Sequence, residues 1–130
     1  MNLLLDTAAL IWWLEGNPRL GSAARAAIVE GENQFFVSAA SVWEMAIKAS
    51  RGRLGFPGRL RDWLPEQLTK YAFASLPVSL AHAAAVEDLP LHHRDPFDRI
   101  LVAQAMTEGL RVVTSDERLS QYQISVLRCS

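Results

Sequence analysis

Short apolar runs alternate along the chain with longer segments whose apolar positions recur at helical spacing. The runs are short and continuous enough for strands buried on both faces, and they occupy Asn2–Leu5, Gln34–Val37, Phe73–Leu76, Arg111–Thr114 and Ile124–Leu127. Helical patterns lie between them, at Thr7–Leu14, Ser22–Val29, Ala39–Ser50, Leu60–Tyr71, Leu80–Glu87 and Pro96–Glu108, with a short turn after Asp116. This alternation predicts an α/β fold of three layers, an α/β/α sandwich in which helices cover both faces of a parallel sheet.

The length and composition are those of one folded domain. The chain has 130 residues, 50% of them hydrophobic and 21% charged, with no internal repeat, so residues 1–130 are expected to form a single domain. Thirteen Lys and Arg residues against fourteen Asp and Glu residues leave a formal net charge of −1. That balance excludes a protein that coats nucleic acid through bulk positive charge, so any phosphate-binding surface must be local.

Cysteine content and hydropathy bear on where the protein acts. Cys129 is the single cysteine, so the chain can build neither an internal disulfide nor a cysteine-based zinc site, and a reducing, cytoplasmic compartment is expected. The longest apolar run, Ala8–Leu14, is far shorter than the ~20 residues that span a bilayer. We therefore expect neither a membrane segment nor an export signal.

Acidic residues follow two of the predicted strands. Ligands of open parallel sheets bind outside the carboxyl ends of the strands, so chemistry is expected there. Asp6 directly follows the first strand, and Asp116 follows the strand Arg111–Thr114. Either acid could simply cap the helix or turn that it precedes, a role worth ~1 kcal/mol, so neither is a strong functional signal by itself.

Glu44 is harder to explain as a cap or a surface residue, because it stands within the apolar segment Val42–Ile47 of a predicted helix. Desolvating an unpaired carboxylate is costly, so an acid in such a setting usually has a cation or several hydrogen-bond donors beside it. The plainer alternative is a residue that reaches solvent at the edge of the sheet or pairs with one arginine.

A further pair of acids opens the last long helix. Asp95 precedes Pro96, which suits the first helical position, so Asp95 is predicted to be the N-cap. Asp98 stands three residues later and therefore projects from the same helix face. Asp98 can reach the edge of the sheet while Asp95 holds the helix start.

Taken together, Asp6, Glu44, Asp98 and Asp116 indicate a divalent metal site. Carboxylates ~5 Å apart repel by about 3 kcal/mol per pair at an effective dielectric constant near 20, a cost that a cation removes. All-oxygen ligation selects a hard ion such as Mg²⁺ or Mn²⁺. Such a site supports hydrolysis of a phosphodiester, in which water attacks in line while the ion stabilises the developing charge; one ion or two would serve.

The same residues fall in motifs that resemble the PIN-domain ribonucleases, in particular the VapC-type toxins of bacterial toxin-antitoxin modules. The motifs are Leu4–Thr7, Ser41–Lys48, His93–Ala105 and Val113–Asp116, and the resemblance spans nearly the whole chain. It implies a parallel sheet of strand order 3-2-1-4-5 and a metal-dependent endoribonuclease that acts as the toxin of a type II system. Because the first and fourth strands are then neighbours, Asp6 and Asp116 would flank one cleft.

The resemblance also implies roles for individual residues. The metal-binding acids of the family fall on Asp6 and Asp98 as direct ligands, on Glu44 as a ligand or orienter of water, and on Asp116 as an outer-shell or second-metal acid. Asp95 leaves some ambiguity about which acid of its motif touches the metal. The hydroxyls of Thr7 and Ser38 are candidate supporting groups or helix caps.

A local cluster of positive charge suggests a surface that binds nucleic acid. A run of basic residues with no acid among them either binds an RNA backbone or forms an ordinary solvated loop. These residues are Lys48, Arg51, Arg53, Arg59 and Arg61.

Trp12 and Trp13 make the first helix apolar on more than one face, which suggests a protein-binding groove. In the family this region takes the antitoxin, and the toxins usually form homodimers. The histidines, His82, His92 and His93, lack a metal-ligand spacing and are interpreted as surface or loop residues.

Two other functions compete with this interpretation. A phosphoacceptor receiver or an aspartyl phosphatase also places an Asp after the first strand, but Ala8 stands where the phosphatase pattern requires an acid. The receiver pattern requires a lysine after a late strand, and the lysines here are Lys48 and Lys70. The other competitor is a catalytically silent interaction module of the same fold, against which the intact acids argue.

Overall fold

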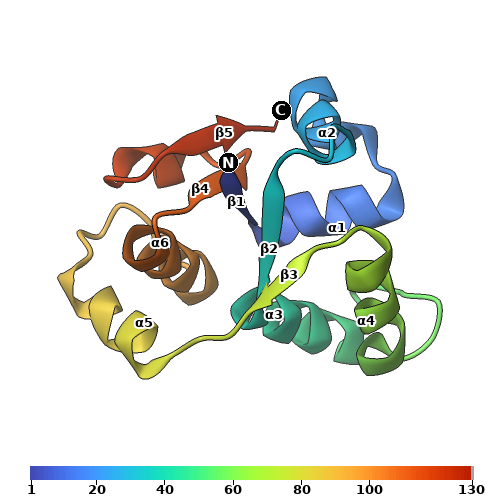
Figure 1. The fold of residues 1–130 in the computed structure, drawn as a ribbon. Coiled ribbons are helices and arrows are strands. Elements are labelled where there is room, and N and C mark those ends of the chain that lie inside the picture. The colour runs from blue at the N-terminus through green and yellow to red at the C-terminus, as the bar shows by residue number, and fades with distance from the viewer. Residues whose placement is uncertain (130) are drawn as a thin grey trace.

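The computed structural model of the chain describes residues 1–129 and is built on a five-stranded parallel sheet (Figure 1). Its strands are β1 (Asn2–Leu5), β2 (Gln34–Ser38), β3 (Ala74–Leu76), β4 (Arg111–Thr114) and β5 (Val126–Arg128). Their order across the sheet is β3-β2-β1-β4-β5, and every neighbouring pair runs parallel. This topology confirms the predicted fold class and puts β1 at the centre of the sheet.

Helices connect the strands and cover both faces of the sheet. They are α1 (Thr7–Glu15), α2 (Ser22–Val29), α3 (Ala39–Ser50), α4 (Leu60–Lys70), α5 (Leu80–Ala85) and α6 (Pro96–Glu108), with short 3₁₀ turns η1 (Pro18–Leu20), η2 (Val86–Asp88) and η3 (Glu117–Gln121). In Figure 1, α1 and α2 lie on one side of the sheet, and α5 and α6 lie on the other.

The central strand supplies side chains to two hydrophobic cores. Leu3 and Leu5 point into the core shared with α1, α2 and α3, whereas Leu4, between them, points into the core shared with α6. All three side chains are completely buried, and burial of each contributes about 1.5–3 kcal/mol. A strand apolar at successive positions is therefore explained by helices on both faces.

Polar caps start two helices directly at the carboxyl ends of strands. Asp6 follows β1 and accepts a hydrogen bond from the amide of Ala9 at 2.8 Å, which caps α1. Ser38 ends β2 and accepts one from the amide of Ala40 at 3.0 Å, which caps α3. Because each cap satisfies an otherwise unpaired helix amide, these helices begin without a connecting loop at the edge where chemistry is expected.

The structure differs from the predicted elements mainly at their ends. The last strand begins at Val126 rather than at Ile124, because the Ile124 amide bonds to the Tyr122 carbonyl in a tight turn. The helix expected over Leu80–Glu87 ends at Ala85 and continues as η2. The turn η1 was not predicted from the sequence. None of these differences moves an acidic candidate.

Among residues 1–129, no helix combines the length and the apolar character needed to cross a bilayer.

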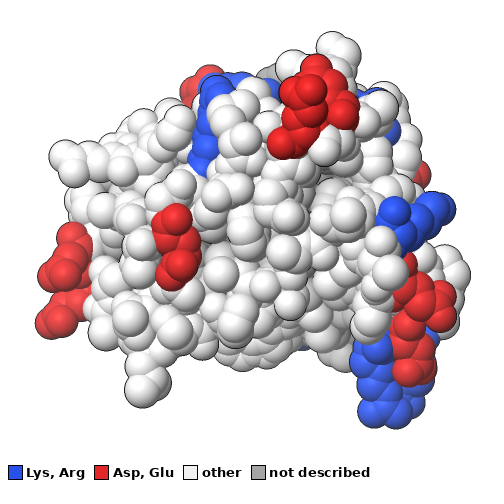
Figure 2. All heavy atoms as spheres, viewed as in Figure 1, with Lys and Arg blue, Asp and Glu red and all other residues white. Residues whose placement is uncertain are grey.

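The face seen in Figure 1 is largely uncharged in its centre, with acidic and basic side chains toward its rim (Figure 2). That face carries no continuous basic surface, which agrees with the small net charge of the chain.

Candidate active site

Five acidic residues line one open cavity of about 450 Å³; one is Glu15 at the end of α1, and the other four come from separate parts of the chain. They are Asp6 after β1, Glu44 in α3, Asp98 in the first turn of α6, and Asp116 after β4. Pairing of β1 with β4 brings Asp6 and Asp116 to the same edge of the sheet. The acids singled out in the sequence therefore share one surface, as a common site requires.

Asp6 is both a helix cap and a wall of this cavity. Its side chain accepts a hydrogen bond from the Ala9 amide, and the residue is only 5% exposed. The pKa of Asp6 is raised to about 6, mainly by burial and to a lesser extent by the charges of Asp116 and Glu44, against the lowering effect of hydrogen bonds. Ionisation of Asp6 therefore costs more in the folded protein than in water, and a cation in the cavity would offset this cost.

The two acids of α6 have separate positions. Asp95 caps the helix by accepting a hydrogen bond from the Phe97 amide at 2.8 Å, and it is not among the residues that line the cavity. Asp98 lies one turn in and does line it. The pKa of Asp98 is raised to about 7, mainly by burial and to a lesser extent by the charges of Asp95 and Asp6. Asp98 is therefore the acid of this motif that is placed to meet a cation.

Asp116 has the opposite electrostatic setting. Its oxygens accept hydrogen bonds from the Arg118 side chain at 3.1 Å and 2.9 Å. The hydrogen bonds from Arg118 are the main cause that lowers the pKa of Asp116 to about 2, against a smaller effect of burial. Asp116 therefore stays ionised while Asp6 and Asp98 resist ionisation.

Glu44 forms an ion pair, as expected for a carboxylate in an apolar segment. The Lys48 ammonium lies 3.0 Å from its carboxylate, one helical turn away, and both residues line the cavity. The Glu44 side chain is 13% exposed, so the pair is partly screened from water. Lys48, one of the basic residues singled out in the sequence, lies in α3 and borders the acidic cavity.

Sequence reasoning missed the contacts of His93: the residue lies in a loop, as expected, but it is buried and not at the surface. The residue is 5% exposed, and its Nε2 lies 2.8 Å from an Asp116 oxygen and 3.1 Å from an Asp98 oxygen. His82 is buried as well, within the capping box of α5, and contacts Glu108 at 2.9 Å. The available signal for His93 was its place two residues before the Asp95 cap, but spacing cannot reveal contact with Asp116.

The hydroxyl candidates lie in different places. The Thr7 hydroxyl donates to Ser41 at 3.0 Å, and Thr7 lines the cavity. Ser38 caps α3 and is not among the residues that line the cavity.

The other basic candidates are exposed, lie between α3 and the first turn of α4, and do not line the cavity. They are Arg51, Arg53, Arg59 and Arg61.

The tryptophan pair on α1 is half-buried. Trp13 packs edge-on against Tyr71 at 5.1 Å between ring centres, and both Trp12 and Trp13 pack against the core beneath α1. The large apolar side chains that do reach solvent include Trp43, which is 64% exposed. Trp12 nevertheless borders the acidic cavity.

The donor set fits a hard divalent cation. Carboxylate oxygens are the ligands that Mg²⁺ and Mn²⁺ prefer, and the four predicted acids line one cavity together with Glu15. One ligand atom each from His93, Asp98 and Asp116 lies within 4.8 Å of the others. A cation would offset the cost of ionising Asp6 and Asp98, which supplies a physical reason for holding both acids there.

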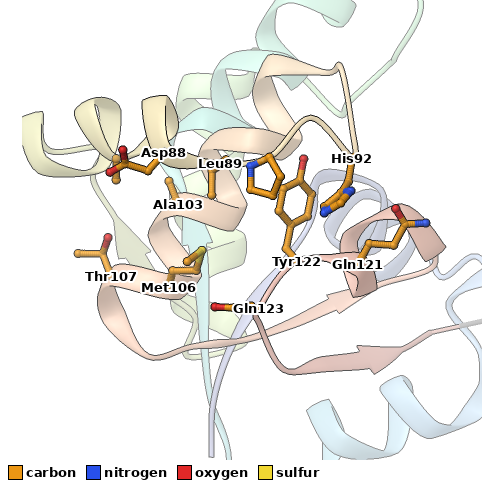
Figure 3. Close-up of a pocket in the computed structure, with 11 residues that line it drawn as sticks. Asp88, Leu89, His92, Ala103, Met106, Thr107, Gln121, Tyr122 and Gln123 are labelled. Atoms are coloured by element: carbon orange, nitrogen blue, oxygen red, sulfur yellow. The ribbon is translucent and has the colours of Figure 1, made fainter.

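A second cavity, of about 480 Å³, lies between η2, α6 and the end of η3. Figure 3 shows Leu89, Met106 and Tyr122 on its walls, with His92 beside the Tyr122 ring. None of the four clustered acids lines it. Its link to the acidic cavity is the Tyr122 hydroxyl, which accepts a hydrogen bond from the backbone amide of His93 at 3.0 Å.

The PIN-domain family model matches residues 3–124. The chain belongs to the PIN-domain family. A relative from Mycobacterium tuberculosis (strain ATCC 25618 / H37Rv), Ribonuclease VapC22, is 33% identical over 122 residues, which are 93% of this chain and 92% of the relative. Membership in the PIN-domain family separates the chain from the receivers and phosphatases considered above.

Solved structures share the PIN fold at low sequence identity. VapBC2 from Rickettsia felis, bound to a DNA fragment from its promoter, has a TM-score of 0.74 at 10% identity and covers 100% of both chains. A toxin-antitoxin complex from Klebsiella pneumoniae has a TM-score of 0.66 at 18% identity, over 96% of this chain and 95% of the other. At these identities the similarity concerns the fold alone.

Proposed function

We propose that this PIN-domain protein is a metal-dependent endoribonuclease that hydrolyses RNA phosphodiester bonds. The observation that carries the proposal is the cavity lined by Asp6, Glu44, Asp98 and Asp116, which come from separate elements. The similarity to Ribonuclease VapC22 supports RNA as the substrate. A divalent cation, Mg²⁺ or Mn²⁺, would stabilise charge on the phosphoryl and leaving oxygens.

Each acid has a distinct role in this proposal. Asp6 and Asp98 are the direct ligands, because both line the cavity and burial disfavours their ionised forms without a cation. Glu44, paired with Lys48, is a ligand or orients the attacking water. Asp116, held by Arg118, is an outer-shell acid or serves a second ion. Asp95 supports the site by fixing the start of α6.

Basic side chains beside the cavity supply the proposed contacts to the RNA backbone. Lys48 stands at the cavity itself, so its ammonium can approach a phosphate close to the acids. Exposed guanidinium groups extend this surface along the loop between α3 and α4, and they belong to Arg51, Arg53, Arg59 and Arg61. Arginine forks bind phosphate through paired hydrogen bonds, which suits a local site on a chain of net charge −1.

We further propose that the protein is the toxin of a type II toxin-antitoxin system in the cytoplasm. Similarity to Ribonuclease VapC22 and to a toxin-antitoxin complex of the same fold supports this assignment. Trp12 borders the acidic cavity, so an antitoxin segment that covers the cavity would contact the α1 region. For a homodimer, the apolar groove that includes Trp43, Phe97 and Ile100 is the surface we assign to the second copy.

Cleavage of RNA by the purified protein tests the activity. Wild type is incubated with RNA in Mg²⁺ and in EDTA, beside Asp6→Asn and Asp98→Asn, and the cleavage ends are mapped. We expect cleavage in Mg²⁺ alone, and loss of cleavage in both variants with the fold retained, because Asn keeps the size of Asp without its charge. Full activity in both variants would rule out the assigned site. Absence of any cleavage by wild type would favour the silent interaction module.

A further inference from the structure

His93 presents one nitrogen to two of the clustered acids. Its Nε2 lies 2.8 Å from Oδ2 of Asp116 and 3.1 Å from Oδ2 of Asp98. Asp98 lies in the first turn of α6 and Asp116 follows β4, so the imidazole joins the start of α6 to the carboxyl end of β4. The side chain is 5% exposed, and water therefore competes little for these contacts.

The other ring nitrogen determines which atom carries the proton. Nδ1 of His93 lies 3.0 Å from the backbone nitrogen of Asp95, which can only donate. Nδ1 must therefore accept, and the proton of the neutral imidazole resides on Nε2. In this tautomer Nε2 donates to carboxylates and has no lone pair for a metal.

The backbone around His93 is held from several directions. Its amide donates to the Tyr122 hydroxyl at 3.0 Å, on the wall of the second cavity (Figure 3). The Arg99 guanidinium donates to the same hydroxyl at 3.3 Å and to the His93 carbonyl at 3.4 Å. With its amide, its carbonyl and Nδ1 all engaged, the imidazole has one orientation, and that orientation aims Nε2 at the acids.

We propose that His93 is a positioning residue that fixes the Asp98 and Asp116 carboxylates for cation binding by donating one shared N–H, and that it is not itself a metal ligand. The inference rests on the proposed function for the identity of the cation site. A buried histidine with a purely structural role would need one acceptor for Nε2, whereas two carboxylates of the same cavity share this one. Donors behind metal-binding carboxylates set their orientation and therefore the affinity of the site.

Binding of Mn²⁺ alone, without RNA, tests the inference on the full-length protein. Isothermal titration calorimetry compares wild type with His93→Gln, whose amide nitrogen reaches the place of Nε2, and His93→Asn, whose amide nitrogen reaches only the place of Nδ1. We expect the Mn²⁺ dissociation constant of His93→Gln to stay within about threefold of wild type, and that of His93→Asn to rise about 10- to 100-fold. In an Asp116→Asn background, the effect of His93→Asn should shrink, because one of its two acceptors is already changed.

A second measurement needs no variant and excludes the ligand alternative. Electron spin echo spectra of Mn²⁺ bound to wild type should lack the coupling of a directly coordinated imidazole nitrogen. Such a coupling would overturn the inference, as would equal losses of affinity in His93→Gln and His93→Asn, or unchanged affinity in both. If wild type binds no Mn²⁺, both the inference and the metal-dependent mechanism fail. If Mn²⁺ binds and His93 behaves as expected but RNA is not cut, only the proposed function fails.

Discussion

Removal of the Asp6 charge should stabilise the metal-free protein at neutral pH. Asp6 is 5% exposed, and burial is the main cause that raises its pKa from 3.8 to about 6. Between these pH values the folded protein keeps a proton that the unfolded chain has lost, so stability falls as pH rises from about 4 to about 6 and stays lower above. Asn keeps an oxygen that can accept the Ala9 hydrogen bond and cap α1, but it carries no charge.

The size of the effect follows from the pKa change. A rise of about 2 units at about 1.4 kcal/mol per unit corresponds to about 3 kcal/mol lost by wild-type Asp6 above pH 7. In a domain of 130 residues this equals roughly 10 °C in melting temperature. In EDTA, Asp6→Asn should therefore match wild type near pH 4 and melt higher by up to that amount at pH 8. A bound cation should remove the advantage, because it stabilises wild type more than the variant.

Thermal unfolding at pH 4, pH 6 and pH 8, in EDTA and in excess Mg²⁺, provides the assay. Asp62→Asn is the matched control, because Asp62 is an exposed acid in the first turn of α4 and loses the same charge away from the cavity. A melting difference for Asp6→Asn that does not depend on pH would refute the reasoning. So would a variant less stable than wild type at pH 8 in EDTA.

Three further outcomes are expected from the same geometry. Glu44→Gln should reduce the Mg²⁺-induced rise in melting temperature, with a smaller gain in EDTA than Asp6→Asn because the Lys48 pair is also lost; an equal Mg²⁺ response would remove Glu44 from the site. Trp43→Asp should convert the dimer to a monomer in analytical ultracentrifugation, because Trp43 lines the groove assigned to the second copy. If the variant remains a dimer, the dimer forms through another surface. Substitution of glutamate for the exposed arginines should weaken RNA binding and reduce the slope of log affinity against log salt by about 1 for each lost phosphate contact. An unchanged slope would mark an ordinary surface. The arginines are Arg51, Arg53, Arg59 and Arg61.

Local patterns in the sequence were sufficient to predict the layers of the fold and the caps. Alternating apolar runs and helical periodicities depend on neighbouring residues, and they placed β1, β4 and α6 where the structure has them. Capping is equally local, so Asp95 before Pro96 could be recognised as the start of α6. The choice of Asp98 over Asp95 rested on the resemblance to the family, whose acid stands one helical turn in and leads the apolar run, because helix geometry puts both acids on one face.

The tertiary structure decided the contacts between distant segments. His93 was expected in a loop and lies in one, but its contact with Asp116 depends on a segment distant in the sequence. Lys48 was expected in a helix, but its position at the acidic cavity depends on what the other elements place beside α3. Trp13 was an apolar surplus on α1 until Tyr71 covered it. Periodicity determines which side of an element is apolar, but burial and pKa depend on what the other elements place against that side, so they emerge only when the chain is folded.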